Sequence, residues 1–311
     1  MMPWLLSALG LVILLFAGDA LVRGAVNLAL RIGIPALIVS LTIVAFGTSA
    51  PELLISVSAV IDNAPGIALG NVVGSNIANV LLVLGIPAMI SVLHTSQCDT
   101  RKGYFHMLGA TLLFIALAWW GTLTWVSGLI LLTALAAILA IMFRDALAHR
   151  DSGKEEDLDG VDPTMPGWRI GVFLVAGLVG LPIGASLLVE NATIIALSLG
   201  VSEAVIGLTL VAVGTSLPEL ATTVMAARHG KADVALGNVI GSNFFNLLGI
   251  IGIALLFGPI PTGAEFNLDL AVMLVAALLL IPFVMFRRDI TRLWGLGLTA
   301  LYLVYLAILF I

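Results

Sequence analysis

Ten apolar stretches, each about 20 residues long and separated by short polar connections, divide the chain. An α-helix of about 20 mostly apolar residues is long enough to cross the hydrocarbon core of a bilayer. The pattern therefore predicts an all-α polytopic membrane protein with ten transmembrane helices. The expected spans are residues 4–22, 35–60, 67–93, 104–120, 123–143, 170–189, 204–227, 234–257, 268–286 and 293–311.

Composition and charge support this interpretation and orient the spans. Of the 311 residues, 61% are hydrophobic and only 10% are charged, against roughly 25% charged in soluble proteins. When the connections are assigned alternately to two sides, all 13 Lys and Arg residues fall on one side. Cytoplasmic loops are rich in these residues, so that side is predicted to be cytoplasmic and both termini external. Residues 1–22 lack a basic start and a cleavage site, and we expect a retained span.

Two copies of one motif pair lie 167 residues apart. The first copy reads GTSAPE from Gly47 and GNVVGSNIAN from Gly70, and the second reads GTSLPE from Gly214 and GNVIGSNFFN from Gly237. With five spans per half, the copies cross the membrane in opposite directions, as in the inverted repeats of secondary transporters. We expect a first five-helix repeat at 1–143 with its motif region at 45–85, a cytoplasmic linker at 144–169, and a second repeat at 170–311 with its motif region at 212–252. No nucleotide-binding P-loop is present, so transport is driven by a gradient or is passive.

Glu52 and Glu219 occupy matching positions inside apolar spans. A carboxylate at mid-membrane costs a few kcal/mol or more and usually marks a functional site. Pro51 and Pro218 are expected to kink each helix and to free the carbonyl four residues earlier. Further small or hydroxyl-bearing residues share the two helical faces: Ala45, Thr48, Ser49 and Ser56, and Ala212, Thr215, Ser216 and Thr223.

A second polar stripe follows each motif. Its members recur every four residues along the third and eighth spans: Asn71, Ser75 and Asn79, and Asn238, Ser242 and Asn246. Gly70 with Gly74, and Gly237 with Gly241, are predicted to be packing contacts between helices rather than ligands. Oxygen donors without clustered thiols or imidazoles suit calcium, sodium or magnesium. Two carboxylates can neutralise one divalent or two monovalent ions, which is an electrostatic basis for exchange.

The remaining polar residues carry weaker signals. The four histidines lack metal-ligand spacing, and the single cysteine, Cys98, excludes an internal disulfide. Asp157, Asp159 and Gly160 in the linker fail the spacing of an EF-hand loop, which favours a solvated connection. Asp19 and Glu190 are interpreted as interfacial charges. Their spans, the first and sixth, are a hypothetical mobile gate, and locking either one to the other helices by a disulfide should then stop transport.

The paired motifs resemble the alpha repeats of the cation/calcium exchanger superfamily, and the whole pattern is similar to its bacterial inner-membrane calcium/sodium antiporter branch. The likeness covers essentially the entire chain. It implies that Glu52 and Glu219 hold calcium and share their charge with sodium. It also implies neighbouring ligands, namely Ala45, Thr48, Ser49, Ala212, Thr215 and Ser216 beside the carboxylates and Ser75, Asn79, Ser242 and Asn246 on the facing helices. Asn246 departs from relatives that carry aspartate there, including potassium-dependent exchangers, which weakens the case for potassium co-transport.

We therefore expect a secondary active antiporter of the plasma membrane, not an enzyme, that exchanges calcium for sodium by alternating access. Calcium, sodium and the lipid bilayer are its expected partners, and we expect no cofactor and no nucleic acid. A calcium/proton antiporter is the nearest alternative, because a vacated carboxylate could take up a proton. A cation channel with acidic rings and an intramembrane acid/base enzyme are more distant alternatives.

Overall fold

The computed structural model describes residues 2–151, 165–199 and 212–309. Within these ranges the protein is helical, with two isolated β-bridges and no β-strand. The first half contains α1 (Met2–Ile32), α2 (Ala36–Val39), η1 (Ser40–Val44), α3 (Ala45–Thr48), α4 (Ala50–Ile61), α5 (Pro65–Ala78), η2 (Asn79–Val83), α6 (Gly85–Ile90), η3 (Thr95–Gln97), α7 (Arg101–Trp119) and α8 (Trp125–Asp151). The second half contains α9 (Gly167–Ser198), α11 (Ala212–Thr215), α12 (Leu217–Arg228), α13 (Ala232–Phe244), η5 (Phe245–Ile250), α14 (Ile251–Ala254), η6 (Ala264–Phe266), α15 (Asn267–Leu278), α16 (Ile281–Val284) and α17 (Arg292–Leu309).

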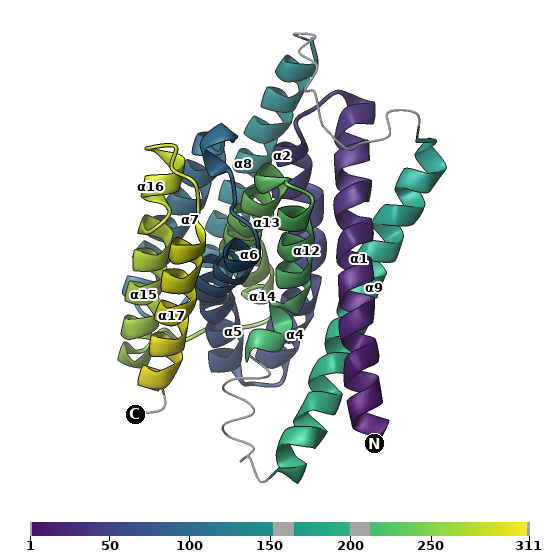
Figure 1. Cartoon of the computed structure of the whole chain (residues 1–311). Helices are drawn as coiled ribbons and strands as arrows, with labels where there is room; N and C mark the ends of the chain where they lie inside the picture. The colour runs from purple at the N-terminus through teal and green to yellow at the C-terminus, as the bar shows by residue number, and fades with distance from the viewer. Residues whose placement is uncertain (1, 152–164, 200–211, 310–311) are drawn as a thin grey trace.

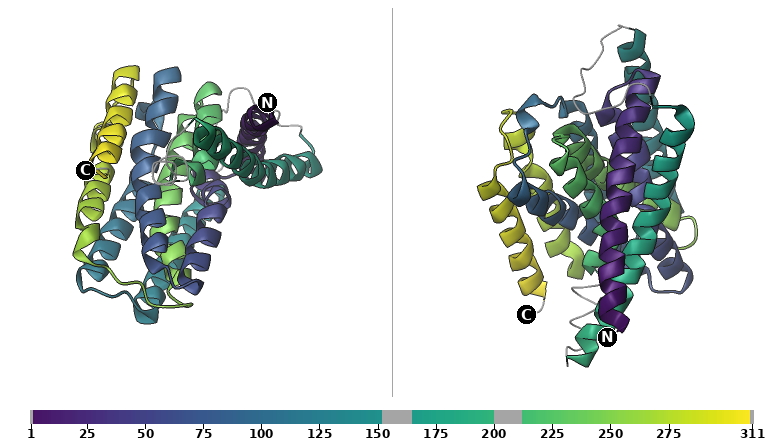
Figure 2. Two further views of the ribbon diagram at one scale, coloured as in Figure 1. Left: turned by 90° about the horizontal axis from the view of Figure 1, so that it is seen from below. Right: turned by 45° about the vertical axis from the view of Figure 1, so that its right-hand side comes forward.

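The helices form one bundle with a long helix pair at its edge (Figure 1). Helices α1 and α9 pack along each other at this edge, and Figure 2 shows the pair projecting from the remaining helices. The two motif-bearing segments lie in the interior. All of the apolar window in Ala232–Ala254 and 78% of that in Pro65–Ile90 are buried, against 17% in Trp125–Ala148. Both motif-bearing segments are therefore mostly buried in the interior of the bundle.

One end of the bundle carries several basic residues. Thr95 of η3 donates a hydrogen bond to the Arg288 carbonyl, and Arg101 at the start of α7 donates one to the Met285 carbonyl just after α16, whose label lies at the upper end in Figure 1. We call this the basic end. Helix α1 begins and helix α17 ends toward the other side of the bundle, which we call the opposite end.

Eight helices in the described ranges are long and apolar enough to cross a membrane, or nine if the bent pair Ala36–Thr48 and Ala50–Ile61 counts as one span. The predicted number of ten is not confirmed, because the seventh expected span, 204–227, begins outside the described residues. Helix α1 continues to Ile32 rather than ending at residue 22, and α8 continues to Asp151, inside the expected linker. Apolar runs end at charged residues, but helical hydrogen bonds continue through them, so the expected ends were too early. The linker residues Asp157, Asp159 and Gly160 lie outside the described ranges.

Positions related by the 167-residue offset adopt matching local structure. One β-bridge joins Leu93 to Ile290 and the other joins Leu123 to Ile260, so the offset converts Leu93 into Ile260 and Leu123 into Ile290. The π-helical segments η2 and η5 also correspond, since each begins at or beside the last Asn of its motif. Such π-helical turns occur frequently at functional sites.

Both GTSxPE motifs break their helix at the serine. Ser49 has φ −84° and ψ 6°, and Ser216 has φ −86° and ψ 6°. The helices on either side of Ser49 meet at 44°. Pro51 falls in the first turn of α4, where its missing N–H costs no intrahelical bond. The proline thus sits at the start of a new helix, just after the break, and the glutamate follows it directly.

Candidate functional site

Glu52 and Glu219 lie fully buried in the first turns of α4 and α12. Helix N-termini favour negative charge because their N–H groups point outward. Ser49 Oγ donates a 3.0 Å hydrogen bond to Glu219 Oε1, so the serine of one motif contacts the glutamate of the other. Thr48 and Ser242 also lie beside the Glu219 carboxylate. The two motif copies, far apart in the chain, therefore build a single site.

Two asparagines fix the backbone behind the glutamates. Asn71 Nδ2 donates to the Glu52 carbonyl at 3.2 Å and to Ser56 Oγ at 2.9 Å. Its counterpart Asn238 donates to the Glu219 carbonyl at 3.3 Å and to a threonine hydroxyl of α12 at 3.2 Å. This pair accordingly holds the position of each glutamate.

Three further asparagines tie α5 and η2 to α13. Asn79 Nδ2 donates to Asn243 Oδ1 at 3.0 Å, and Asn243 Nδ2 donates to the Asn76 carbonyl at 3.3 Å. Sequence reasoning did not include Asn76 and Asn243 among the candidate site residues. Their signal was present, because each follows the motif serine at the same position in both copies.

The buried polar centre is the set formed by these glutamates with the buried Ser, Thr and Asn residues of α3, α5, η2, α13 and η5, with Ser49 between α3 and α4, and with Ser216 between α11 and α12. Several of its buried atoms have no hydrogen-bond partner among the described residues: Glu52 Oε1 and Oε2, Glu219 Oε2, Ser75 Oγ, Ser216 Oγ, Asn79 Oδ1, and Asn246 Oδ1 and Nδ2. Buried polar atoms in proteins are almost always paired, and an unpaired buried carboxylate is very costly. This convergence of unpaired oxygens fits a bound cation.

The remaining expected ligands lie in or beside the centre. Thr48 Oγ1 contacts the Ala45 carbonyl at 3.2 Å and Asn238 Oδ1 at 3.3 Å. Thr215 ends α11 and is half-buried beside a cavity that reaches the centre from the opposite end. Ala212 begins α11, and its side chain lies outside the described set.

The charges expected to lie outside the site have other partners or are exposed. Asp19 pairs with Arg23 Nε at 2.9 Å and with His229 Nε2 at 2.6 Å. Glu190 is exposed on α9. No group of three or more His, Cys, Asp or Glu residues within the described ranges has metal-binding geometry. A cation in the centre would thus be held by two carboxylates and neutral oxygens, a donor set that suits hard ions such as calcium and sodium.

Comparison with known proteins places the chain in a family. The family model described as sodium/calcium exchanger protein matches residues 2–144 and 170–311. The sodium/calcium exchanger MaX1 of Methanosarcina acetivorans is 36% identical, over 99% of this chain and 98% of the relative. The inner membrane protein YrbG of Escherichia coli is 33% identical, over 98% and 96%. A solved structure of the sodium-calcium exchanger NCX_Mj, soaked with Na+ and Ca2+, superposes with a TM-score of 0.83 at 33% identity and covers 99% of this chain and 98% of its own. The chain belongs to the family of sodium/calcium exchanger proteins.

Proposed function

We propose that this protein exchanges sodium for calcium across a membrane and that both ions bind in turn at the polar centre. The observation that carries the proposal is the set of unpaired, buried oxygens around Glu52 and Glu219. Two negative charges are balanced by one Ca2+ or by two Na+. The empty site would leave those charges uncompensated in a buried environment, which favours exchange of one cargo for the other over release without replacement.

The proposed ligands are the expected ones. Glu52 and Glu219 supply the charge, and Ser49 orients Glu219 through its hydrogen bond. The other oxygens come from Ala45, Thr48, Ala212, Thr215, Ser216, Ser75, Asn79, Ser242 and Asn246. Asn71 and Asn238 hold the two glutamate backbones, and in this proposal they act through position rather than by binding ions.

The proposed architecture is ten spans in two inverted five-helix repeats, 1–143 and 170–311, joined by the linker 144–169. The family match over 2–144 and 170–311 supports this division, and so does the exchange of partners between the two β-bridges under the 167-residue offset. The basic end is the proposed cytoplasmic side, so both termini lie outside. The similarity to a protein named for the inner membrane supports a bacterial inner-membrane location.

Charge-neutral variants test the site. Glu52→Gln and Glu219→Gln keep the side-chain shape and remove one charge, and a unit charge pair at about 4 Å is worth about 4 kcal/mol at an effective dielectric constant near 20. We expect sodium-dependent calcium flux in reconstituted vesicles to fall by about 100-fold or more. Glu190→Gln, which changes an exposed glutamate on α9, is the matched control and should transport normally. Normal flux in either site variant, at equal protein folding, would refute the proposed site.

A further inference from the structure

A cavity of about 400 Å³ reaches the polar centre from the opposite end of the bundle. It lies between α4, α5, α15 and α17, and its walls include Asn71, Ser75 and Thr215. Ser75 is only 2% exposed, and its hydroxyl has no hydrogen-bond partner among the residues that the structure describes. An unpaired, buried hydroxyl of the centre thus forms part of the cavity wall. A water-sized ion at this point would be within reach of the site.

The corresponding route from the basic end is closed by close packing. An added Cβ at Gly237 would meet Ser40 Cβ at 2.9 Å, and one at Gly241 would meet Ala45 Cβ at 2.6 Å. Their counterparts Gly70 and Gly74, 167 residues earlier, line the opposite-end cavity, and an added Cβ there would meet no described atom within 4 Å. Among the described residues, the glycines of the second motif copy are therefore closely packed, and those of the first copy line a cavity.

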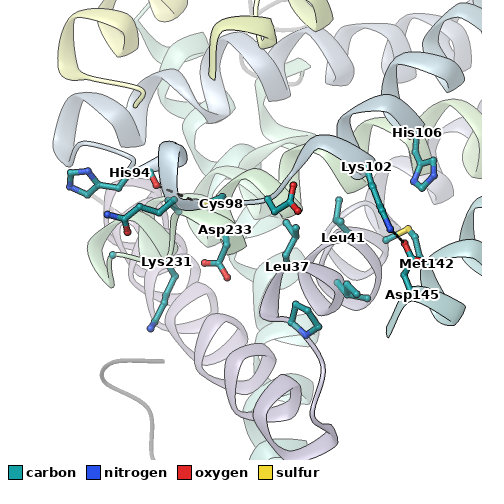
Figure 3. A pocket seen from close by; sticks show the side chains of 17 residues that line it. Leu37, Leu41, His94, Cys98, Lys102, His106, Met142, Asp145, Lys231 and Asp233 are labelled. Atoms are coloured by element: carbon teal, nitrogen blue, oxygen red, sulfur yellow. Dashed lines mark hydrogen bonds and ion pairs between the residues drawn. The ribbon is translucent and has the colours of Figure 1, made fainter. Parts of the chain in front are cut away.

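Figure 3 shows the cavity of about 640 Å³ at the basic end. Leu37 and Leu41 line it, and Lys102 forms a 2.7 Å ion pair with Asp145 at one side of it. None of the described residues that line this cavity belongs to the polar centre. It therefore ends short of the site, whereas the opposite-end cavity does not.

Asp269 is the one charged residue among the described residues that line the opposite-end cavity. It lies in the first turn of α15, half-buried, and Tyr305 Oη of α17 donates a 2.7 Å hydrogen bond to its Oδ1. The residue 167 positions earlier is Lys102, in the basic-end cavity. Equivalent positions in the two halves thus carry opposite charges, and the negative one faces the open route.

We propose that Asp269, positioned by Tyr305, is a cation-recruiting residue of the route through which calcium and sodium reach the polar centre from the opposite end. This inference rests on the proposed exchange function. Apolar walls focus the field of a single carboxylate along a narrow cavity and raise the local concentration of cations. The local enrichment depends exponentially on ion charge, so the factor for Ca2+ is the square of the factor for Na+. The carboxylate lies outside the polar centre. Its loss should therefore change the ion concentration needed for half-maximal transport and leave the maximal rate of transport unchanged.

The test measures initial transport rates in sided membrane vesicles while the ion concentration at the opposite end is varied. Asp269→Asn should raise the half-saturating Na+ concentration by about threefold and that of Ca2+ by about ninefold, with little change in maximal rate. The effect should shrink at high ionic strength, because the screening length falls from about 8 Å at 0.15 M to about 3 Å at 1 M. Tyr305→Phe should produce a smaller shift of the same kind. Glu265→Gln, which changes an exposed acid near the start of α15, is the matched control.

Charge restoration separates the electrostatic role from a structural tie between α15 and α17. The Asp269→Cys substitution is made in a protein that also carries Cys98→Ala, so that it has a single cysteine. Membrane-impermeant thiol reagents are then added at the opposite end. A sulfonate-bearing reagent should restore the half-saturating Ca2+ concentration toward its original value, and a quaternary-ammonium reagent should raise it further. The inference is overturned if Asp269→Asn and Glu265→Gln behave alike, or if both reagents have the same effect. If the unmodified protein shows no sodium-dependent calcium flux, the proposed function fails instead.

Discussion

Asn238 and Asn246 belong to the same motif stripe, yet among the described residues only the Asn238 side chain has hydrogen-bond partners. Asn238 holds the Glu219 carbonyl and a threonine hydroxyl, whereas both amide atoms of Asn246 are buried and have no partner in the described part of the chain. A residue that stabilises the protein scaffold gains from bonds within the protein. A residue that binds a ligand leaves its hydrogen-bonding atoms available in the ion-free protein. The two roles can therefore be separated by measuring the melting temperature with and without the ion.

Alanine variants at these positions should show opposite patterns. Asn238→Ala leaves a buried carbonyl without its donor, which costs about 1–3 kcal/mol, so the ion-free protein should melt several degrees lower. Asn246→Ala breaks no bond within the described protein, so the ion-free melting temperature should change little. Its loss should appear in the calcium-induced rise of the melting temperature, since tenfold weaker binding removes about 1.4 kcal/mol of ligand stabilisation. Equal melting temperatures for the two ion-free variants would contradict this assignment of roles.

For individual residues, the sequence predicted where the polar centre lies but not which of its residues hydrogen-bond to one another. The repeated motif identified Glu52 and Glu219 because buried carboxylates in apolar spans are rare. Asn76 and Asn243 were not predicted as site residues. Their role depends on the direction of an amide group at a helix interface, and residue spacing alone does not determine that direction. The separate functions of Asn238 and Asn246 were hidden for the same reason.

Helix packing around the two motif copies is unequal, although their sequences are nearly identical. Gly241 lies against α3 and η1 so closely that an added Cβ would be 2.6 Å from both Ala45 Cβ and the Leu41 carbonyl oxygen. Gly74 has no described atom within 4 Å of an added Cβ. The small-residue pattern predicted packing contacts for both copies, and among the described residues the structure shows that close contact for the second copy. Small residues in a sequence show that close helix packing is possible. The conformation of the protein determines where that packing is formed.

Gly241→Ala should therefore destabilise the described conformation and Gly74→Ala should not. Overpacking a tight interior contact costs about 1–3 kcal/mol, which should lower the melting temperature of Gly241→Ala by several degrees and leave Gly74→Ala close to the parent protein. Thermal unfolding of the two variants in one detergent provides the comparison, and each serves as the other's control because both add the same methyl group. The reverse order of melting temperatures would show that the open and closed sides have been interchanged.

Element boundaries were predicted less well than element positions. The prolines indicated a disturbed helix, but the chain breaks at Ser49 and Ser216, before each proline. Helix α1 runs on past Arg23 to Ile32, because long basic side chains can extend their charge to the interface while the backbone stays helical. Hydropathy identifies the apolar part of a helix. It carries no information on the backbone hydrogen bonds that continue the helix beyond that part.

For the whole molecule, the sequence predicted an all-helical membrane protein built from two related halves around one buried site. The described ranges bear out the helical bundle, and the family comparison confirms the exchanger assignment. Helices α1 and α9 form a pair at the edge of the bundle, a position compatible with the proposed movement of these two spans against the others. The cavity between α4, α5, α15 and α17 could not be predicted, because both motif copies carry the same glycines and only one of them lines this cavity.

The most direct test of the exchange function is calcium uptake into proteoliposomes loaded with sodium. Matched vesicles are loaded with choline, with and without an imposed pH gradient, so that sodium and proton coupling are measured on the same protein. We predict rapid calcium uptake only when sodium is inside the vesicles and can leave as calcium enters. Uptake that follows the pH gradient and ignores internal sodium would contradict the account and identify a calcium/proton exchanger.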